Sequence, residues 1–141
     1  MYSELDRFDE KIVKVLQSNS RRPFVEIANE IGLSESAVRR RVKNMMNNGI
    51  IEQFTIELGT SGKTSAITLI SVGSTSDTSE VSSELKKLSG VEVIYEITGQ
   101  YDIAAIIAAP SIGEINQCVD DVRKTPGVSD TNTVIILKTI K

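Results

Sequence analysis

The chain has 141 residues, of which 40% are hydrophobic and 25% charged, a balance typical of a folded globular protein. Its longest apolar run is Ile103–Ala109, far short of the roughly 20 residues that a membrane-spanning helix needs. The first residues lack the basic and apolar regions of a signal peptide. One cysteine and no histidine argue against an internal disulfide and an ordinary zinc site. We therefore expect a cytoplasmic protein with no membrane segment, metal or cofactor.

The net charge of −3 conceals an asymmetry between the two parts of the chain. Residues 1–63 contain 10 Lys/Arg and 9 Asp/Glu, whereas residues 64–141 contain 6 and 10. Within residues 20–50 there are six basic side chains and three acidic ones. A locally basic segment on an acidic chain favours a contact with nucleic acid.

Three short helices are predicted in the first 50 residues. Apolar residues at steps of three and four predict a helix over 6–17. Pro23 suits the first turn of a second helix, which Gly32 would end. Ser34 is a candidate N-cap for a third helix over about 34–48. Because the last two helices are joined by a short turn and the third is basic, the pattern predicts a DNA-binding helix-turn-helix.

The third helix supplies most of the candidate DNA contacts. Its first turn would reach base edges or phosphates in the major groove, and the basic residues one and two turns later would neutralise phosphates or read guanine. The candidate residues are Ser34, Glu35, Ser36, Arg39, Arg40 and Lys43, with Arg22 before the second helix. The alternative is that the arginine run is only a solvated helix face. Arg41 lies toward the edge of the apolar stripe and is expected to be structural.

The helical part is followed by a predicted strand and a linker. Residues 50–57 are rich in β-branched and aromatic side chains, which favours a strand. The segment 59–64 is rich in glycine, serine and threonine and is expected to be flexible. The predicted organisation is therefore a helix-turn-helix domain over 1–50, a strand and linker over 51–63, and a second domain over 64–141.

The second domain repeats itself with an offset of 37 residues. The paired elements are strands 65–73 and 102–109, helices 78–89 and 112–124, and strands 91–98 and 128–138. Each helix begins with a candidate capping box, Asp77 with Glu80 and Ser111 with Glu114. This order predicts a ferredoxin-like β-α-β-β-α-β domain, so the chain as a whole is expected to be α+β.

One face of the predicted sheet would be covered by no helix. We expect Val91, Val93, Tyr95, Ile103 and Ala105 to be among the residues that make this face apolar. A small domain rarely exposes such a patch to water, so we expect a second subunit to cover it.

The sequence gives no indication of an enzyme. It lacks histidine, and no thiol–base pair or convergent set of carboxylates is apparent. Cys118 occupies a helix position equivalent to Val81 in the repeat and is interpreted as a small core residue.

The order of these parts resembles the Lrp/AsnC (leucine-responsive/asparagine regulator) family of prokaryotic transcription regulators, and its archaeal members in particular. The stretches that show the resemblance are 6–16, 22–28, 31–42, 49–51, 99–102 and 126–128, which together span nearly the whole chain. The resemblance implies a winged-helix-like helix-turn-helix domain that binds double-stranded DNA. It also implies that the ferredoxin-like domain, called the RAM domain, forms homodimers that assemble into tetramers or octamers.

The resemblance further implies an amino-acid effector, bound between dimers near Gly99, Tyr101 and Asp102, with Thr98 and Thr133 as neighbours. The chemistry suits a zwitterion, because a carboxylate accepts from an ammonium group and exposed backbone N–H groups bind a carboxylate. The alternative is that these residues only form the turn between two strands. The protein would then be an Lrp-like regulator that has no effector and acts through oligomerisation alone.

Overall fold

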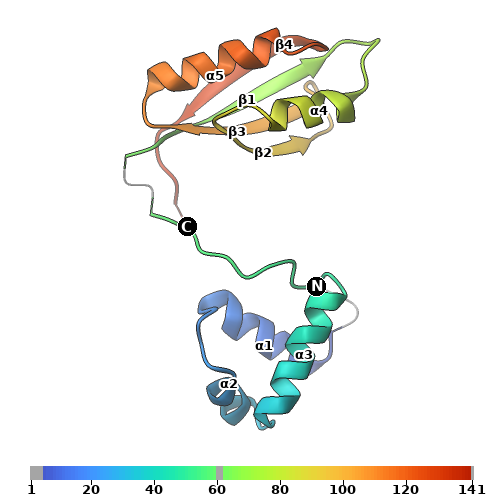
Figure 1. Ribbon diagram of the computed structural model, residues 1–141, viewed down its shortest axis with the longest axis vertical. Helices are drawn as coiled ribbons and strands as arrows, with labels where there is room; N and C mark the ends of the chain where they lie inside the picture. Colours follow the sequence, from blue (N-terminus) through green and yellow to red (C-terminus); the bar gives the residue numbers. More distant parts are fainter. Residues whose placement is uncertain (1–4, 60–61, 141) are drawn as a thin grey trace. The chain divides into compact units, whose positions relative to one another are not determined.

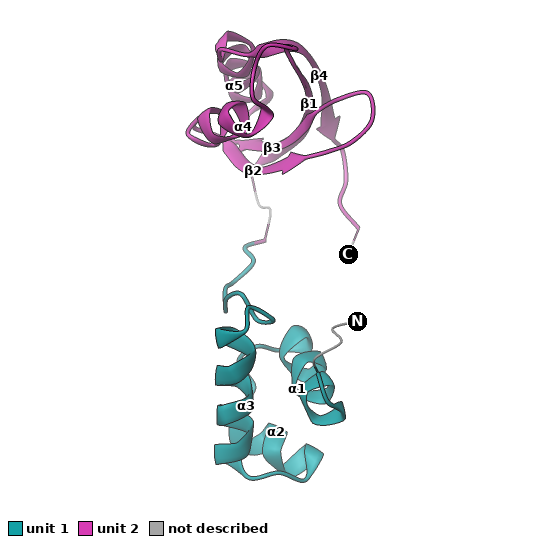
Figure 2. Ribbon diagram, turned by 90° about the vertical axis from the view of Figure 1, so that its right-hand side faces the viewer, with its two compact units in different colours: residues 1–58 teal, residues 59–141 magenta. Residues whose placement is uncertain are grey.

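The computed structural model describes residues 5–59 and 62–140 and divides the chain into two compact units, residues 1–58 and 59–141 (Figures 1 and 2). Each unit has its own hydrophobic core. Thr60 and Ser61, in the predicted linker, lie outside the described residues.

The first unit consists of three helices, as predicted. Their bounds are α1 (Arg7–Ser18), α2 (Phe24–Ile31) and α3 (Glu35–Asn47). The core consists of apolar residues from all three helices, namely Ile12, Leu16, Ile27, Ala28, Ile31, Val38, Val42 and Met45. This packing supplies the stability that such short helices lack when isolated.

The turn between α2 and α3 follows the sequence signals. Gly32 ends α2 in the left-handed conformation, at φ +77°, which glycine adopts without steric cost. Ser34 is the N-cap of α3, since its Oγ accepts a hydrogen bond of 3.2 Å from the N–H of Ala37. The sequence predicts Pro23 in the first turn of α2, but the helix begins at Phe24. Pro23 is therefore the N-cap residue, one position before the first turn.

The prediction of a strand over 50–57 is wrong for this structure. The chain is irregular there, and no strand includes any of residues 50–59. A β-strand needs a neighbouring strand for its backbone hydrogen bonds, and within residues 5–59 and 62–140 the four strands pair only with one another. Propensity alone therefore does not produce a strand in this segment.

The second unit has the predicted β-α-β-β-α-β order. Its elements are β1 (Thr64–Val72), α4 (Thr78–Lys86), β2 (Val91–Glu96), β3 (Ile103–Ala109), α5 (Ile112–Lys124) and β4 (Val128–Ile136). The sheet order is β2-β3-β1-β4, and all three pairs are antiparallel. Helices α4 and α5 lie on the same face of the sheet (Figure 2).

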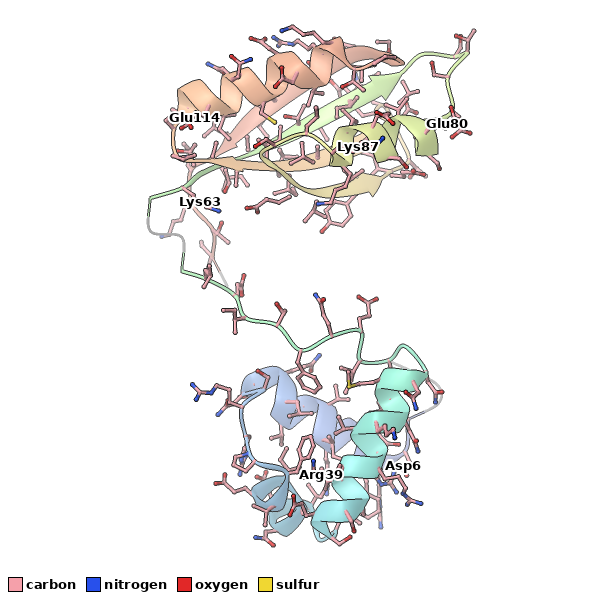
Figure 3. All side chains as sticks on the ribbon, viewed as in Figure 1. Asp6, Arg39, Lys63, Glu80, Lys87 and Glu114 are labelled. Atoms are coloured by element: carbon pink, nitrogen blue, oxygen red, sulfur yellow. The ribbon has the colours of Figure 1, made fainter. Side chains whose placement is uncertain are left out.

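Both helices of this unit begin at the predicted caps. Asp77 and Ser111 each accept a hydrogen bond from a backbone N–H three residues later, that of Glu80 and Glu114. These two glutamates lie in the first turns of α4 and α5 (Figure 3). Their negative charges interact favourably with the positive end of each helix dipole. Cys118 is buried in the core as predicted, and burial raises the pKa of its thiol.

A glycine allows two loops at one end of the sheet to pack closely. Gly127, at φ +92°, precedes β4, and its N-terminal neighbours follow α5. A Cβ atom there would lie 2.6 Å from Cγ2 of Val81 on α4, too close for any side chain. The carbonyl oxygen of Gly127 accepts a 2.8 Å hydrogen bond from the N–H of Gly73, which follows β1.

The apolar residues predicted for the uncovered sheet face need correction. Val93 and Tyr95 are exposed, at 38% and 54%, but Val91, Ile103 and Ala105 are buried in the core. Strand pairing places a different set beside Val93 and Tyr95, because Val93 pairs with Ile106 and Ile106 pairs with Ile67. We call this surface the open face; its larger apolar members are Ile67, Leu69, Val93, Tyr95, Ile106, Val134 and Ile136.

Candidate nucleic-acid interface

The outward side of α3 brings five of the seven predicted DNA-binding residues together. Glu35, Ser36, Arg39, Arg40 and Lys43 line one shallow surface depression, which we call the α3 hollow. Positions 36, 39, 40 and 43 lie on one side of a helix because they are spaced by three and four residues. Ser34 lies at the start of this surface, where its Oγ is 3.1 Å from that of Ser36 while it caps the helix.

Arg39 is held in place on two sides. Its Nη2 lies 2.7 Å from Oε1 of Glu35, one turn earlier on the same helix (Figure 3 labels Arg39). Its guanidinium also lies over the ring of Phe24, the first residue of α2, at 5.3 Å from the ring centre. The side chain is nonetheless 65% exposed, so it is oriented but available to a ligand.

Arg40 and Lys43 are exposed and make no ion pair with any residue that the structure describes. Because neither charge is neutralised by a neighbouring carboxylate, both would add directly to the positive potential of the α3 hollow.

Arg22 is not part of the α3 hollow. Its guanidinium forms ion pairs with two glutamates of α2, at 3.5 Å from Glu26 and 2.5 Å from Glu30. It lines a separate depression together with Lys11 and Lys14 of α1. Any contact of Arg22 with DNA would therefore compete with two carboxylates.

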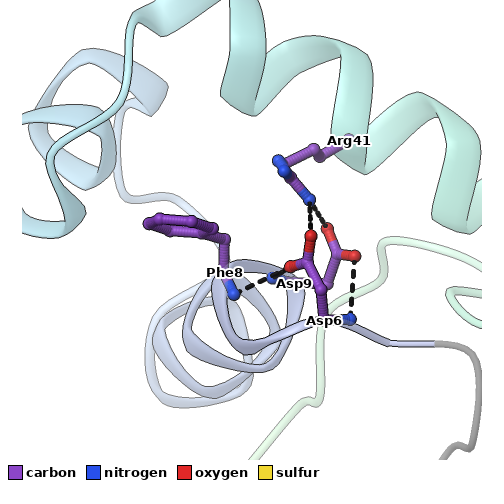
Figure 4. Close-up of polar contacts among 4 residues, drawn as sticks. All are labelled: Asp6, Phe8, Asp9 and Arg41. Carbon is purple, nitrogen blue, oxygen red and sulfur yellow. Dashed lines mark hydrogen bonds and ion pairs between the residues drawn. The ribbon is translucent and has the colours of Figure 1, made fainter.

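Arg41 contacts other residues of the first unit, in agreement with the structural function that its place at the edge of the apolar stripe predicts. Its side chain is only 22% exposed and forms ion pairs with Asp6 and Asp9 at the start of α1 (Figure 4). The hydrogen bonds that Arg41 donates to the carboxylates of Asp9 and Asp6 raise the pKa of Arg41 above its ordinary value. The three consecutive arginines thus divide into two outward residues and one that connects two helices.

The predicted effector loop connects β2 to β3 and includes Thr98, Gly99, Tyr101 and Asp102. Gly99 adopts φ +110°, a conformation that favours glycine. Asp102 has a clear structural function, since its Oδ2 accepts a 2.8 Å hydrogen bond from the N–H of Val72 at the end of β1. Its backbone N–H also donates to the carbonyl of Ile70, so the loop is attached to β1 at two points.

Thr133 is not joined to this loop by hydrogen bonds among the described residues. It lies on β4 opposite Thr68 of β1, and the two hydroxyl oxygens are 2.9 Å apart. Thr68 is completely buried between the sheet and its helices. Thr133 thus gives the buried hydroxyl of Thr68 a hydrogen-bond partner.

Sequence reasoning missed three residues that organise the first unit, namely Phe24, Asp6 and Asp9. The stacking of Arg39 on Phe24 has no spacing signature in the sequence. The Asp6–Asp9 pair has the spacing of a capping box, with Asp in place of the usual Ser or Thr and Glu. This substitution of residue types hid the signal.

A helix-turn-helix with a basic outward face, joined to a ferredoxin-like unit, defines a class of protein: DNA-binding transcriptional regulators. Two family comparisons agree with this class. Residues 5–46 match the AsnC-type helix-turn-helix domain, and residues 65–141 match the Lrp/AsnC ligand binding domain. The chain belongs to the Lrp/AsnC family of transcriptional regulators, whose members are not enzymes.

Several relatives span nearly the whole chain. The HTH-type transcriptional regulator LysM of Saccharolobus solfataricus is 39% identical, with 97% of this chain and 96% of that protein covered. The regulator FL11 of Pyrococcus horikoshii is 35% identical, with 97% and 92% covered. A transcriptional regulator of Neisseria meningitidis, solved as a complex with L-methionine, is 28% identical with a TM-score of 0.88, and 97% and 92% of the two chains are covered. In the part of this chain that the structure describes, no helix is long and apolar enough to span a membrane.

Proposed function

We propose that this regulator binds specific sites on double-stranded DNA through the outward side of α3, with Ser34, Glu35, Ser36, Arg39, Arg40 and Lys43 at the interface. The observation that supports this proposal most strongly is the α3 hollow, where three cations and two further polar side chains line one surface. A recognition helix enters the major groove with such a face. The DNA of a prokaryotic cell lies in the cytoplasm, so the protein would act there.

Different residues of the α3 hollow suit different parts of DNA. Arg39 is already oriented by Glu35 and Phe24, and a fixed planar guanidinium suits bidentate hydrogen bonds to guanine. Arg40 and Lys43, which have no carboxylate partner among the described residues, suit phosphates. Arg22 would be a peripheral phosphate contact that requires release from Glu26 or Glu30.

The protein would bind DNA as a homodimer joined through the open face of the second unit. Val93, Tyr95 and Val134 of this face are between 38% and 54% exposed in the single chain. A second copy would bury these side chains and place two helix-turn-helix units on one DNA duplex. Dimers would then assemble further into tetramers or octamers.

The loop that includes Gly99, Tyr101 and Asp102 would bind an amino acid between dimers, with Thr98 and Thr133 nearby. Support comes from the match to a ligand binding domain and from the L-methionine complex of the Neisseria meningitidis protein. The second candidate is a regulator without an effector, which the hydrogen bond between Asp102 and Val72 favours because it gives Asp102 a structural function.

The DNA interface is tested by gel-shift titration of genomic binding sites with Arg40→Ala and Lys14→Ala. Both substitutions remove one exposed cation from the first unit, but only Arg40 lines the α3 hollow. Arg40→Ala is expected to weaken binding about tenfold, with Lys14→Ala close to the wild type. Equal affinities for Arg40→Ala and the wild type would contradict the proposal.

The effector is tested by calorimetric titration, beginning with L-methionine and continuing through the other amino acids. Asp102→Asn is the informative variant, because its amide oxygen can still accept from the N–H of Val72 while the negative charge is lost. Loss of ligand binding by a variant of unchanged stability supports the effector site. If no amino acid binds to the wild type, the effector-free regulator is the better description.

A further inference from the structure

We infer that Arg41, Asp6 and Asp9 form a positioning cluster that holds the recognition helix in its DNA-binding orientation without touching DNA. This inference rests on the proposed DNA interface of α3. It assigns a function in DNA recognition to two carboxylates, which ordinary electrostatics would expect to oppose the binding of a polyanion.

One nitrogen of Arg41 holds both carboxylates. Its Nη1 lies 2.7 Å from Oδ2 of Asp6 and 2.9 Å from Oδ1 of Asp9 (Figure 4). The side chains of Arg41 and Asp9 are only 22% and 15% exposed. The Asp6 side chain is 50% exposed, so the hydrogen bond in partly buried surroundings is the one from Arg41 to Asp9. A charged hydrogen bond in such surroundings is less screened by salt than one on the surface.

The same carboxylates also cap α1. Oδ1 of Asp6 accepts from the N–H groups of Phe8 and Asp9, at 2.8 and 2.9 Å. Oδ2 of Asp9 accepts in return from the N–H of Asp6, at 3.3 Å. Each carboxylate therefore uses one oxygen for the first turn of α1 and the other for Arg41, so the cluster fastens the start of α1 to the middle of α3.

Arg41 is confined on its remaining sides. Its guanidinium lies 5.4 Å from the centre of the Phe8 ring, and its Nε is buried without a hydrogen-bond partner among the described residues. Turning this side chain outward to a phosphate would leave two carboxylates close together without their cation. The geometry thus commits Arg41 to the interior of the unit.

The position of Arg41 in the sequence connects this cluster to the interface. Arg39 and Arg40 directly precede it and point to the α3 hollow. A rotation or tilt of α3 against α1 would move these arginines and Lys43 together, because they project from one helix. Contacts to base edges depend on such placement, so a loose helix weakens binding even when every DNA-contacting side chain is present.

Asp9→Asn gives the decisive test, because two explanations predict opposite signs. If Asp9 were merely an acidic residue near DNA, removing its charge would strengthen binding. The positioning cluster instead predicts binding that is about five- to tenfold weaker, within the range of interaction energies in ion-pair networks. The matched control is Glu10→Gln on the next residue, which is exposed and is expected to leave binding unchanged or slightly stronger.

A second variant separates positioning from direct contact. Arg41→Met keeps an unbranched side chain, and the account predicts weaker DNA binding with an unchanged dependence on salt concentration. If Arg41 contacted a phosphate, the log–log slope would fall by about 0.9. Arg41→Lys restores one cation beside the two carboxylates and is expected to recover part of the affinity.

All binding curves are measured at a temperature at which circular dichroism shows the variants to be fully folded. Wild-type affinity in Asp9→Asn, or a shallower salt slope in Arg41→Met, would overturn the positioning cluster. Failure of the proposed DNA interface would look different, because Arg40→Ala would then bind like the wild type. A loss of affinity in Arg40→Ala without a loss in Asp9→Asn would reject the positioning cluster alone.

Discussion

The two units of this chain expose different kinds of surface, one charged and the other apolar. In the first unit the core is apolar, and the proposed DNA-binding surface consists of charges. Two arginines and a lysine point outward there, and a third arginine forms ion pairs within the unit. In the second unit the ion pairs lie on exposed parts of the surface, and the distinctive surface is an uncovered apolar sheet face. The first unit suits a polyanion and the second suits another protein surface.

This difference explains why the average composition misleads. The net charge of −3 combines a first part that is nearly neutral with a second part that is clearly acidic. The acidic second part would repel DNA if it were responsible for binding. The comparison therefore predicts that substitutions on the α3 hollow will weaken DNA contacts and spare dimerisation, whereas substitutions on the open face will act on dimerisation first.

The largest effect is expected from an acid placed on the open face. Val134→Asp would bury an unpaired carboxylate in the proposed dimer interface, and we expect about a thousandfold weaker dimerisation. The side chain is 49% exposed in the single chain, so the unit itself should still fold. Analytical ultracentrifugation measures the dimer, with Ile112→Asp, an exposed position on α5, as the control that should remain dimeric. An unchanged dimer in Val134→Asp would remove the open face from the interface.

The next effect tests whether the two units are stabilised separately. Gly127→Ala forces a left-handed conformation on alanine and places its Cβ 2.6 Å from Val81, so we expect the second unit to lose about 2 to 4 kcal/mol of stability. Hydrogen exchange resolved by residue should show faster opening in the second unit only. Gly59→Ala is the control, because no atom lies within 4 Å of its added Cβ. Equal destabilisation of both units would contradict their independence.

The smallest expected effect is on the stability of the first unit at low pH. Hydrogen bonds from the backbone of Asp9 and then from Arg41 lower the pKa of Asp6 below its ordinary value of 3.8. A carboxylate with a lowered pKa in the folded state contributes stability above the unfolded pKa and loses it as the pH falls through the folded pKa. We expect the first unit of Asp6→Asn to be less stable than the wild type at neutral pH, and the difference to narrow below about pH 4. Thermal unfolding of the two proteins across this range measures the difference; a constant gap would contradict the role of the Asp6 charge.

Much of the fold could be predicted because periodicity reports local structure. The three helices of the first unit and the repeated order of the second follow from apolar spacing and from caps such as Ser34 and Ser111. The open face could not be predicted in the same way. The strand β3 is apolar at every position, so alternation does not tell Ala104 from Ala105, and a register shift beside Val91 turns that residue toward the core.

The candidate site was predictable only in part for a related reason. Helical spacing brings Arg39, Arg40 and Lys43 to one side, and the edge of the apolar stripe identifies Arg41 as structural. The partners of these residues depend on tertiary packing. Asp6 and Asp9 are more than 30 residues from Arg41 in the chain, and Phe24 approaches Arg39 only when α2 packs on α3.

The central claim is that the outward side of α3 binds DNA while Arg41 does not. The most direct measurement is the salt dependence of DNA affinity for the wild type and for the double variant Arg40→Ala, Lys43→Ala. Each lost phosphate contact should reduce the log–log slope by about 0.9, so the double variant is expected to be shallower by about 1.8. An unchanged slope would show that these cations do not contact the DNA backbone and would contradict the account.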